Sequence, residues 1–307
     1  VDAVIIATST WSHVEPALAA ADAGHMMMIE KPLATDARES LEVLSAIQAA
    51  GVDAVVGYTQ RFRRRFLVVK EQTGQIGDVT AAVTRAFMNR MAPTGEVRLT
   101  QDRRFLTPMV VSGTHSLDMC LWLMGDAAKP VSVYARSNDK IMSELGTKDA
   151  TFGVFTMEDG TIWSMNICWS LPKVWPGSVY GLEIGIVGTK GVLDIEDTHR
   201  DVILATELPQ GPGYNPDGLE MEVERNVDFL TSFPPGDMYK GDLWGPLREE
   251  TNSWFRRIYL DKATPHATAA EGHRNLVLTM AMDLSAKRKT ELELPITPDE
   301  LMAGLEA

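Results

Sequence analysis

The sequence predicts half of a parallel α/β domain followed by an α+β domain. Two observations carry this prediction. Residues 3–56 alternate short apolar runs with helical segments, and from about residue 80 β-branched runs separated by tight turns dominate. The first pattern requires right-handed crossovers and hence parallel strands, whereas the second is typical of strands joined as hairpins.

Three short apolar runs near the start predict strands that are buried on both faces. They cover residues 3–7, 26–29 and 52–56. A sheet that binds a dinucleotide has about six strands in two halves, and a glycine-rich turn follows its first strand. No such turn precedes these runs, since the chain opens with Val1. We therefore expect the chain to begin partway through a cofactor-binding domain.

Local signals also place the two helices between these strands. Ser12 and Glu15 form a Ser-x-x-Glu capping box, and Gly24 ends the Ala-rich segment that follows. Asp36 begins the second helix, and Gly51 closes it. The resulting order is strand, helix, strand, helix, strand, which predicts a parallel sheet.

The remainder of the chain predicts strands first and helices afterwards. Strand-like runs lie at residues 79–87, 131–135, 151–157, 161–167 and 182–187. Turns at residues 158–160 and 188–191 connect neighbouring runs as hairpins. Apolar stripes of helical spacing follow at Leu219, Val223, Val227 and Leu230, at residues 247–258 and at residues 277–284. Thr268 and Glu271 form a capping box for the last helix, and residues 208–218 predict a loop.

Composition and charge disfavour several classes of function. The chain has 307 residues and a formal net charge of −13, which argues against nucleic acid or an anionic membrane surface as the main partner. Cys120 and Cys168 lie in apolar surroundings and predict buried free thiols, which fit a reducing compartment. No apolar run approaches the length of a membrane span, and no Cys/His cluster has the spacing of a metal site. We expect a cytoplasmic protein with no metal, no nucleic-acid partner and no membrane partner.

Lys31 is the first candidate for a catalytic side chain. It follows the predicted strand at residues 26–29 and precedes Pro32, so it lies at the carboxyl edge of a parallel sheet, where such sheets bind ligands. An ammonium group there can polarise a substrate hydroxyl or, once desolvated, accept its proton. A surface lysine in a turn is the alternative interpretation.

His115 is the second candidate. It lies at the start of a helix whose apolar face includes Leu117 and Cys120, and it shares a different face with Asp118 and Trp122. An imidazole can relay the proton of an alcohol during hydride transfer. The alternative is a partly buried histidine near a helix cap.

Short motifs occur in a fixed order along nearly the whole chain. They are residues 4–34 with Glu30-Lys31-Pro32-Leu33-Ala34, residues 57–62, residues 113–118, residues 185–191 and residues 281–286. Together they resemble the Gfo/Idh/MocA family, the glucose–fructose oxidoreductase and inositol dehydrogenase group. The resemblance implies half of a Rossmann domain at residues 1–60. At residues 61–307 it implies an α+β domain for substrate binding and oligomerisation, with a large, open, mostly antiparallel sheet and a C-terminal segment that packs back on the first domain.

The resemblance also implies an enzyme that uses NAD or NADP, and roles for individual residues. Lys31 matches the family's catalytic lysine, and His115 matches its active-site histidine. Pro32 would carry a cis peptide bond that aims the lysine, and Glu30 would orient the lysine or touch the cofactor ribose. Many family dehydrogenases carry an aspartate four residues before the histidine, whereas this chain has Val111. The chain therefore departs from the Lys-Asp-His arrangement and from a simple polyol dehydrogenase.

Further candidates come from the ends of the same predicted strands and from the larger sheet. Those expected to bind the cofactor are Thr8, Ser9, Thr10, His13, Glu30, Lys31, Pro32, Gln60 and Arg61. Those expected to contact substrate are Tyr58, Asp118, Trp169 and Trp175. Helix capping is an equal alternative for the hydroxyls at residues 8–10, and sheet packing is the expected role of Trp163.

We expect reversible hydride transfer between a nicotinamide and a secondary alcohol of a sugar, cyclitol or related polyhydroxy compound, with Lys31 and His115 handling the proton. Two alternatives keep the fold: an NAD-dependent glycosidase, and a non-catalytic relative that senses the cofactor for regulation. The large sheet would expose an apolar face unless it were covered, so we also expect a homodimer or homotetramer.

Overall fold

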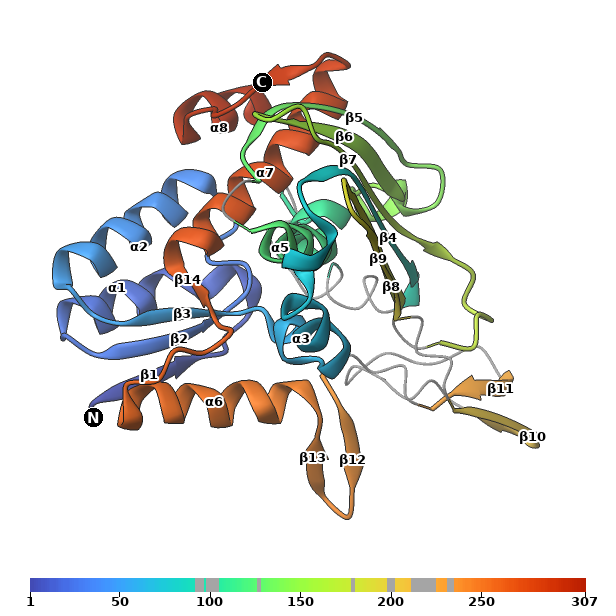
Figure 1. The fold of residues 1–307 in the computed structure, drawn as a ribbon, viewed down its shortest axis with the longest axis horizontal. Helices are drawn as coiled ribbons and strands as arrows, with labels where there is room; N and C mark the ends of the chain where they lie inside the picture. Colours follow the sequence, from blue (N-terminus) through green and yellow to red (C-terminus); the bar gives the residue numbers. More distant parts are fainter. Residues whose placement is uncertain are drawn as a thin grey trace.

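The computed structural model of the chain contains two main sheets with helices packed between and around them (Figure 1). It describes residues 1–91, 97, 105–125, 128–177, 180–197, 202–210, 225–230 and 235–307. The smaller sheet is built mostly from the start of the chain, and the larger one mostly from residues 79–197. The predicted fold class, a Rossmann-like parallel sheet followed by a larger, mostly antiparallel sheet, is confirmed.

The smaller sheet has the strand order β1-β2-β3-β14. Its strands are β1 (Ala3–Ile6), β2 (Met26–Glu30), β3 (Ala54–Gly57) and β14 (Ala267–Thr268). The first three strands are parallel, and β14 joins β3 in the antiparallel direction. Met27, Ile29 and Val56 are fully buried, as expected for strands with helices on both faces. The carboxyl ends of β1, β2 and β3 consequently meet at one edge.

Three helices cover the two faces of this sheet (Figure 1). They are α1 (Val14–Asp22), α2 (Ala37–Ala50) and α6 (Pro246–Leu260). The helices α1 and α2 pack together on one face, with Val43 and Ile47 in a shared apolar core. On the other face, Trp254 of α6 packs against Met28 and Val55. A helix from late in the chain therefore completes a sheet formed at its start.

The two predicted helix starts in this region have different outcomes. Asp36 caps α2 as predicted, because its carboxylate accepts a hydrogen bond from the main-chain N–H of Arg38 at 2.7 Å. The predicted Ser12 capping box is wrong. The Ser12 hydroxyl donates instead to the carbonyl of Ser9 at 2.9 Å within a 3-10 turn, η1 (Thr10–Ser12), and α1 begins at Val14. The extra turn uses the hydroxyl that would have capped the helix.

The larger sheet has the strand order β15-β5-β6-β7-β4-β8-β9. Its strands are β4 (Val79–Asn89), β5 (Pro130–Asn138), β6 (Ala150–Met157), β7 (Ile162–Leu171), β8 (Tyr180–Gly188), β9 (Val192–Asp197) and β15 (Leu292–Glu293). Only β4 and β7 pair in parallel among these neighbours. The two predicted hairpin turns are present, and in the second the N–H of Gly188 donates to the carbonyl of Gly191 at 2.9 Å.

Helices cover one face of the larger sheet and leave the other open. The covering helices are α5 (Thr114–Met124), α7 (Ala269–Arg288) and α8 (Pro298–Glu306). Trp163 lies on the covered face, where it stacks on Phe155 and donates its indole N–H to the Thr84 hydroxyl at 3.0 Å. The predicted capping box of Thr268 and Glu271 starts α7, which runs between the two sheets (Figure 1). The helix α7 therefore contacts strands of both sheets.

Shorter elements complete the described fold. They are η2 (Thr59–Phe62), α3 (Arg64–Lys70), η3 (Thr73–Ile76), the π-helical turn η4 (Met109–Gly113), η5 (Met142–Leu145), β10 (Ile203–Gln210), β11 (Arg225–Phe229), β12 (Asp237–Tyr239) and β13 (Asp242–Trp244). None of the helices that the structure describes is long and apolar enough to cross a membrane. Cys120 is a buried free thiol, and Cys168 is free and only partly buried.

One predicted helix is wrong where the structure describes it. Val227 lies in β11 and pairs with Ala205 of β10, while Leu219 and Val223 lie outside the described residues. Apolar residues at every fourth position also fall on one face of a strand, so pairing with β10 decides the outcome. Of the predicted loop at residues 208–218, Leu208 belongs to β10, and residues 211–218 lie outside the described part.

Candidate active site

The site is built around the end of β2. The strand ends at Glu30, and Lys31 follows at the carboxyl edge of the smaller sheet. The Lys31–Pro32 peptide bond is cis, as the resemblance implied. The carboxylate of Glu30 lies beside Gly57 at the end of β3, and a Cβ atom at that glycine would lie only 3.2 Å from it. Gly57 therefore leaves the space that Glu30 occupies.

Lys31 reaches from this edge to the turn that precedes α5. Its ammonium group donates a hydrogen bond to the main-chain carbonyl of Val111 at 3.0 Å. Val111 lies in η4, which continues directly into α5, and His115 is the second residue of that helix. Single π-turns of this kind occur often at functional sites. The contact brings Lys31, which follows β2, close to His115 of α5, and these are the two predicted catalytic residues.

His115 combines a lowered pKa with a buried ring nitrogen. Its ring nitrogen Nδ1 is buried and has no hydrogen-bond partner within the described residues. Desolvation and, to a smaller degree, the charge of Lys31 hold the pKa of His115 well below its ordinary value. The imidazole is therefore neutral at physiological pH. A buried, unpartnered ring nitrogen is costly unless a ligand or water satisfies it.

Tyr58 contacts the first two residues of α5. Its hydroxyl is hydrogen-bonded to the hydroxyl of Thr114 at 2.8 Å, and its ring meets His115 edge-on with centroids 6.2 Å apart. Burial raises the pKa of Tyr58, so the phenol stays protonated. The structure thus differs from the expectation that Tyr58 contacts substrate: a fully buried phenol with a protein partner positions the start of α5.

Arg61 and Asp118 form a buried ion pair. The Arg61 guanidinium donates two hydrogen bonds to the Asp118 carboxylate, at 2.6 and 2.8 Å, and a third to Glu271 at 2.9 Å. Asn275 donates a further one to Asp118 at 2.8 Å. Both members of the pair are almost wholly excluded from solvent. The expectation that Arg61 binds cofactor and Asp118 binds substrate is corrected, because protein groups occupy both side chains.

Trp169 and Gln60 are buried in the structure, whereas Trp175 is partly exposed. Trp169 has no exposed surface and donates its indole N–H to the hydroxyl of Ser112 at 2.9 Å, so it packs beneath η4 and cannot stack on a sugar. Trp175 keeps some exposure and meets Phe229 edge-on with centroids 6.2 Å apart. Gln60 is buried and accepts a hydrogen bond from Arg63 at 3.3 Å. Of these three, only Trp175 retains surface for a ligand.

His13 fixes the turn that carries Lys31. One ring nitrogen of His13 lies 2.8 Å from the carbonyl of Pro32, and the other lies 3.2 Å from the carbonyl of Thr8. The ring is buried. The expectation that His13 contacts the cofactor is therefore corrected to a positioning role. It ties the end of β1 to the turn after β2.

The residues after β1 remain available to a ligand. Thr8 and Ser9 are exposed, and Thr10 is half-buried. The Thr8 hydroxyl donates to the carbonyl of Ser12 at 3.0 Å, which leaves its oxygen able to accept. Thr8, Ser9 and Glu30 are thus the described residues at this edge that could contact a nicotinamide ribose, while the sequence contains no glycine-rich turn for the pyrophosphate.

Glu250 is a buried acid with a raised pKa, and no sequence pattern pointed to it. It projects from α6, is fully buried, and accepts a hydrogen bond from the Thr59 hydroxyl at 2.7 Å. Its second oxygen has no partner within the described residues. Burial, and less strongly the nearby charges of Glu30 and Asp118, raise the pKa of Glu250 to about 8. An acidic residue in an amphipathic helix carries no local signal that it will be buried.

Comparison with known proteins identifies the family. Residues 1–58 match the model described as oxidoreductase family, NAD-binding Rossmann fold, and residues 70–194 match the GFO/IDH/MocA C-terminal domain. Inositol 2-dehydrogenase of Rhodococcus erythropolis is 30% identical over 52% of this chain and 44% of that protein. Inositol 2-dehydrogenase 2 of Saccharopolyspora erythraea is 29% identical over 79% of this chain and 64% of that protein. The chain spans about half the length of the curated relatives it matches.

Solved structures with the same fold support this assignment. A probable dehydrogenase from Thermotoga maritima aligns with a TM-score of 0.72 and 20% identity, over 98% of this chain and 81% of that one. Scyllo-inositol dehydrogenase from Lactobacillus casei, with bound NAD(H) and scyllo-inositol, aligns with a TM-score of 0.68 and 17% identity, over 95% of this chain and 80% of that one. At these identities the likeness concerns the fold alone. On the two matched models and this shared fold, the chain belongs to the GFO/IDH/MocA family.

Proposed function

We propose that the chain is the catalytic part of an NAD- or NADP-dependent oxidoreductase acting on a secondary alcohol of a sugar, cyclitol or related polyhydroxy compound. The observation that carries the proposal is the contact of Lys31 with Val111, since the ammonium group then acts on the neutral imidazole of His115. Nδ1 of that imidazole has no hydrogen-bond partner among the described residues. Relatives named inositol 2-dehydrogenase support a cyclitol or sugar as the substrate class.

In this proposal, Lys31 stabilises the substrate oxygen and His115 accepts the proton of the substrate hydroxyl. Lys31 uses one N–H on the carbonyl of Val111, and two N–H donors remain for the oxygen of a substrate hydroxyl. They stabilise the negative charge that develops on this oxygen as its proton leaves. His115 is neutral and can accept that proton as a general base. A bound nicotinamide would accept the hydride, and Thr8, Ser9 and Glu30 would hold its ribose side.

Turnover by the purified chain tests the proposal. Because the sequence contains no glycine-rich turn for the pyrophosphate, the cofactor is supplied in large excess. We then expect NADH or NADPH to form when myo-inositol, scyllo-inositol or glucose is added. Lys31→Met and His115→Asn should each reduce this rate by about 10²- to 10⁴-fold, as removal of a general acid or base does. Lys129→Met is the matched control, since the Lys129 side chain is exposed and pairs with the exposed Glu158 at 3.5 Å.

Other outcomes would favour the alternatives. Cleavage of a nitrophenyl glycoside without net NADH would favour a glycosidase of the same fold. A rise in melting temperature with cofactor, but no turnover of any polyol, would favour a cofactor-sensing relative. Unchanged turnover in Lys31→Met would reject the proposed roles of Lys31 and His115.

We further propose that the open face of the larger sheet is the contact between subunits of a homodimer or homotetramer. Apolar side chains recur on this face, where no helix covers them: Val83, Phe87, Tyr134, Phe152, Val154 and Ile162. Phe152 stacks on Phe87 with ring centroids 6.0 Å apart, and Arg85 pairs with Glu183 on the same face. A contiguous apolar face of this kind is typical of a protein contact.

A further inference from the structure

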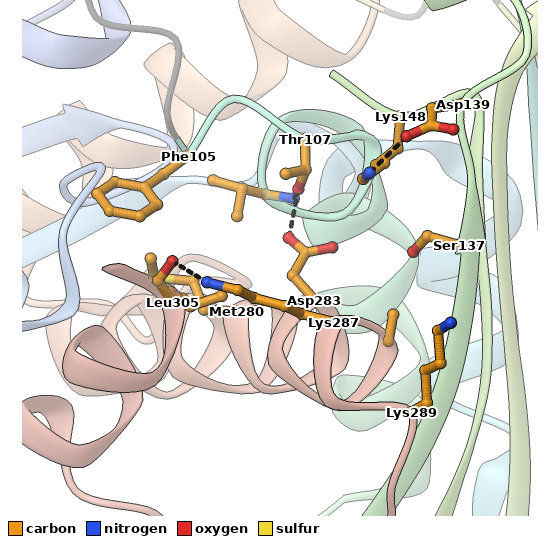
Figure 2. A pocket seen from close by; sticks show the side chains of 12 residues that line it. Phe105, Thr107, Ser137, Asp139, Lys148, Met280, Asp283, Lys287, Lys289 and Leu305 are labelled. Atoms are coloured by element: carbon orange, nitrogen blue, oxygen red, sulfur yellow. Dashed lines mark hydrogen bonds and ion pairs between the residues drawn. The ribbon is translucent and has the colours of Figure 1, made fainter. Parts of the chain in front are cut away.

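A second cavity lies apart from Lys31 and His115. Its volume is about 580 Å³, within the range of small-molecule sites. Its walls come from η4 and the residues before it, the end of β5 with Asp139, Lys148 in the turn that leads to β6, and the helices α7 and α8 with Lys289 (Figure 2). Val110 lines this cavity, whereas the carbonyl of its neighbour Val111 holds Lys31. The cavity therefore borders the proposed active site without including either of its two catalytic candidates.

The cavity has an apolar end and a polar end. Phe105 and Met280 lie at one end in Figure 2, with the Lys287 ammonium group bound to the Leu305 carbonyl beside them. Ser137, Asp139, Lys148 and Lys289 lie at the other end. Asp283 projects from α7 between them. This division suits a ligand that has an apolar stem and a polar head.

The charges around the cavity do not balance. Lys148 pairs with Asp139 at 2.7 Å, so these two largely compensate each other. Lys287 donates to the carbonyl of Leu305 at 2.7 Å, and neither Lys287 nor Lys289 has a carboxylate partner within the described ranges. Asp283 is the other carboxylate in the cavity wall. Three ammonium groups therefore face two carboxylates, which leaves a net positive charge on the wall.

Near neutral pH, part of the Asp283 population is protonated, so its carboxyl group can act as a hydrogen-bond donor in the cavity. One of its oxygens accepts a hydrogen bond from the Thr107 hydroxyl at 2.5 Å. Desolvation raises the pKa of Asp283 to about 7, although the Thr107 hydrogen bond and the charge of Lys148 act in the opposite direction. The charged groups that share its cavity are Lys148, Asp139, Lys287 and Lys289. Below neutral pH, Asp283 is a neutral carboxyl group that can donate to an anion.

We propose that this cavity binds a small organic anion, with its carboxylate or phosphate group at Lys289, Lys148 and Ser137 and its apolar stem against Phe105 and Met280. The site is separate from the proposed dehydrogenase centre, and it would bind its ligand whether or not the cofactor is present. A protonated Asp283 completes the anion's hydrogen bonds. A neutral ligand of the same shape gains nothing from the ammonium groups.

Calorimetric titration of the chain tests this proposal without any activity measurement. The probes are benzoate, phenyl phosphate and benzyl alcohol, and the titrations are run near pH 6 and near pH 8. We expect benzoate or phenyl phosphate to bind and benzyl alcohol to bind at least tenfold more weakly, because ion-assisted hydrogen bonds supply the difference. Benzoate should bind up to about tenfold more tightly at the lower pH, where Asp283 is protonated. Whichever anion binds more tightly identifies the head group.

Two variants assign the binding to this cavity. Lys289→Gln should weaken the preferred anion by about tenfold, whereas Lys129→Gln, an exposed lysine outside the cavity, should leave it unchanged. Asp283→Asn keeps an acceptor for Thr107 and should abolish the pH dependence. Equal binding of benzyl alcohol and benzoate, no binding of either anion near pH 6, or unaltered binding in Lys289→Gln would each overturn the proposal.

Discussion

Lys31 meets residue 111 through the main-chain carbonyl of Val111, 3.0 Å from its ammonium nitrogen, and not through a side chain. At this position many family dehydrogenases carry an aspartate, and the chain departs from their Lys-Asp-His arrangement. A carbonyl of η4 is present whatever residue stands there. The lysine is therefore anchored by the course of the backbone, and its positive charge acts on His115.

The proximity of Lys31 and His115 predicts how the pKa of His115 changes when Lys31 is replaced. In Lys31→Met the pKa of His115 should rise, because the positive charge that disfavours the imidazolium is lost. It should remain below the ordinary value, since desolvation is the larger cause of its depression. Following the histidine resonances by NMR across a pH range measures the pKa of His115 in the parent and in the variant. Lys129→Met provides the control, and a His115 titration that is identical in all three proteins would contradict the proximity of the two groups.

Glu250 predicts a loss of stability as pH rises. Its pKa is about 8 in the folded chain, raised mainly by burial, and 4.5 is the reference value that applies to an unfolded chain. Between these values the folded state binds a proton that the unfolded state releases, so the free energy of unfolding falls with pH. The contribution of this one group is at most roughly 1.4 kcal/mol per pH unit.

Glu250→Gln should remove that contribution while keeping an acceptor for the Thr59 hydroxyl. The variant should resemble the parent near pH 5 and be the more stable protein near pH 8, by about 1–3 kcal/mol after relaxation of the site. Urea unfolding at a series of pH values measures the difference. Asp283 shifts in the same direction, so only the comparison of parent and variant isolates Glu250. Parallel pH profiles for the two proteins would show that Glu250 does not hold a proton in the folded state.

The Arg61–Asp118 pair predicts a stability effect rather than a direct effect on ligand binding. Arg61→Met should cost about 3–5 kcal/mol of unfolding free energy, because it leaves the buried Asp118 carboxylate without its main partner. The double variant Arg61→Met/Asp118→Leu should recover part of this loss. Lys129→Met breaks the exposed pair with Glu158 and should cost no more than about 1 kcal/mol. Denaturant unfolding followed by circular dichroism compares them, and a small loss in Arg61→Met would mean that the carboxylate is satisfied in another way.

Local sequence signals correctly predicted where helices begin and end. They failed where a segment becomes a strand by pairing with a partner that is distant in the sequence. Asp36, Gly51 and the Thr268–Glu271 box act within one helical turn, and all three signals are confirmed. The strand that contains Val227 could not be distinguished from a helix by spacing alone, because its pairing with β10 decides it.

For the site, the sequence predicted where a residue lies along the fold but not which groups surround its side chain. Strand order correctly placed Lys31 at a sheet edge, but it could not tell that Arg61 turns inward to Asp118. The partners of Arg61 come from α5 and α7, and Glu271 lies 210 positions further along the chain. Glu250 reaches Thr59 across 191 positions. Burial of such groups is a property of tertiary packing, on which spacing and composition carry no information.

The open face of the larger sheet gives the last prediction, which concerns assembly. Phe152 is 45% exposed in the single chain and lies near the middle of the face, where β6 neighbours β5 and β7. A carboxylate at this position would be buried without a partner at a sheet-to-sheet contact, so Phe152→Asp should convert a dimer or tetramer to a monomer. Tyr239→Asp is the matched control, because Tyr239 is a 63% exposed aromatic residue on the β12–β13 hairpin, away from the sheet. Light scattering at micromolar concentration measures the masses: a monomeric parent, or a Phe152→Asp variant that stays assembled, would exclude this face as the contact.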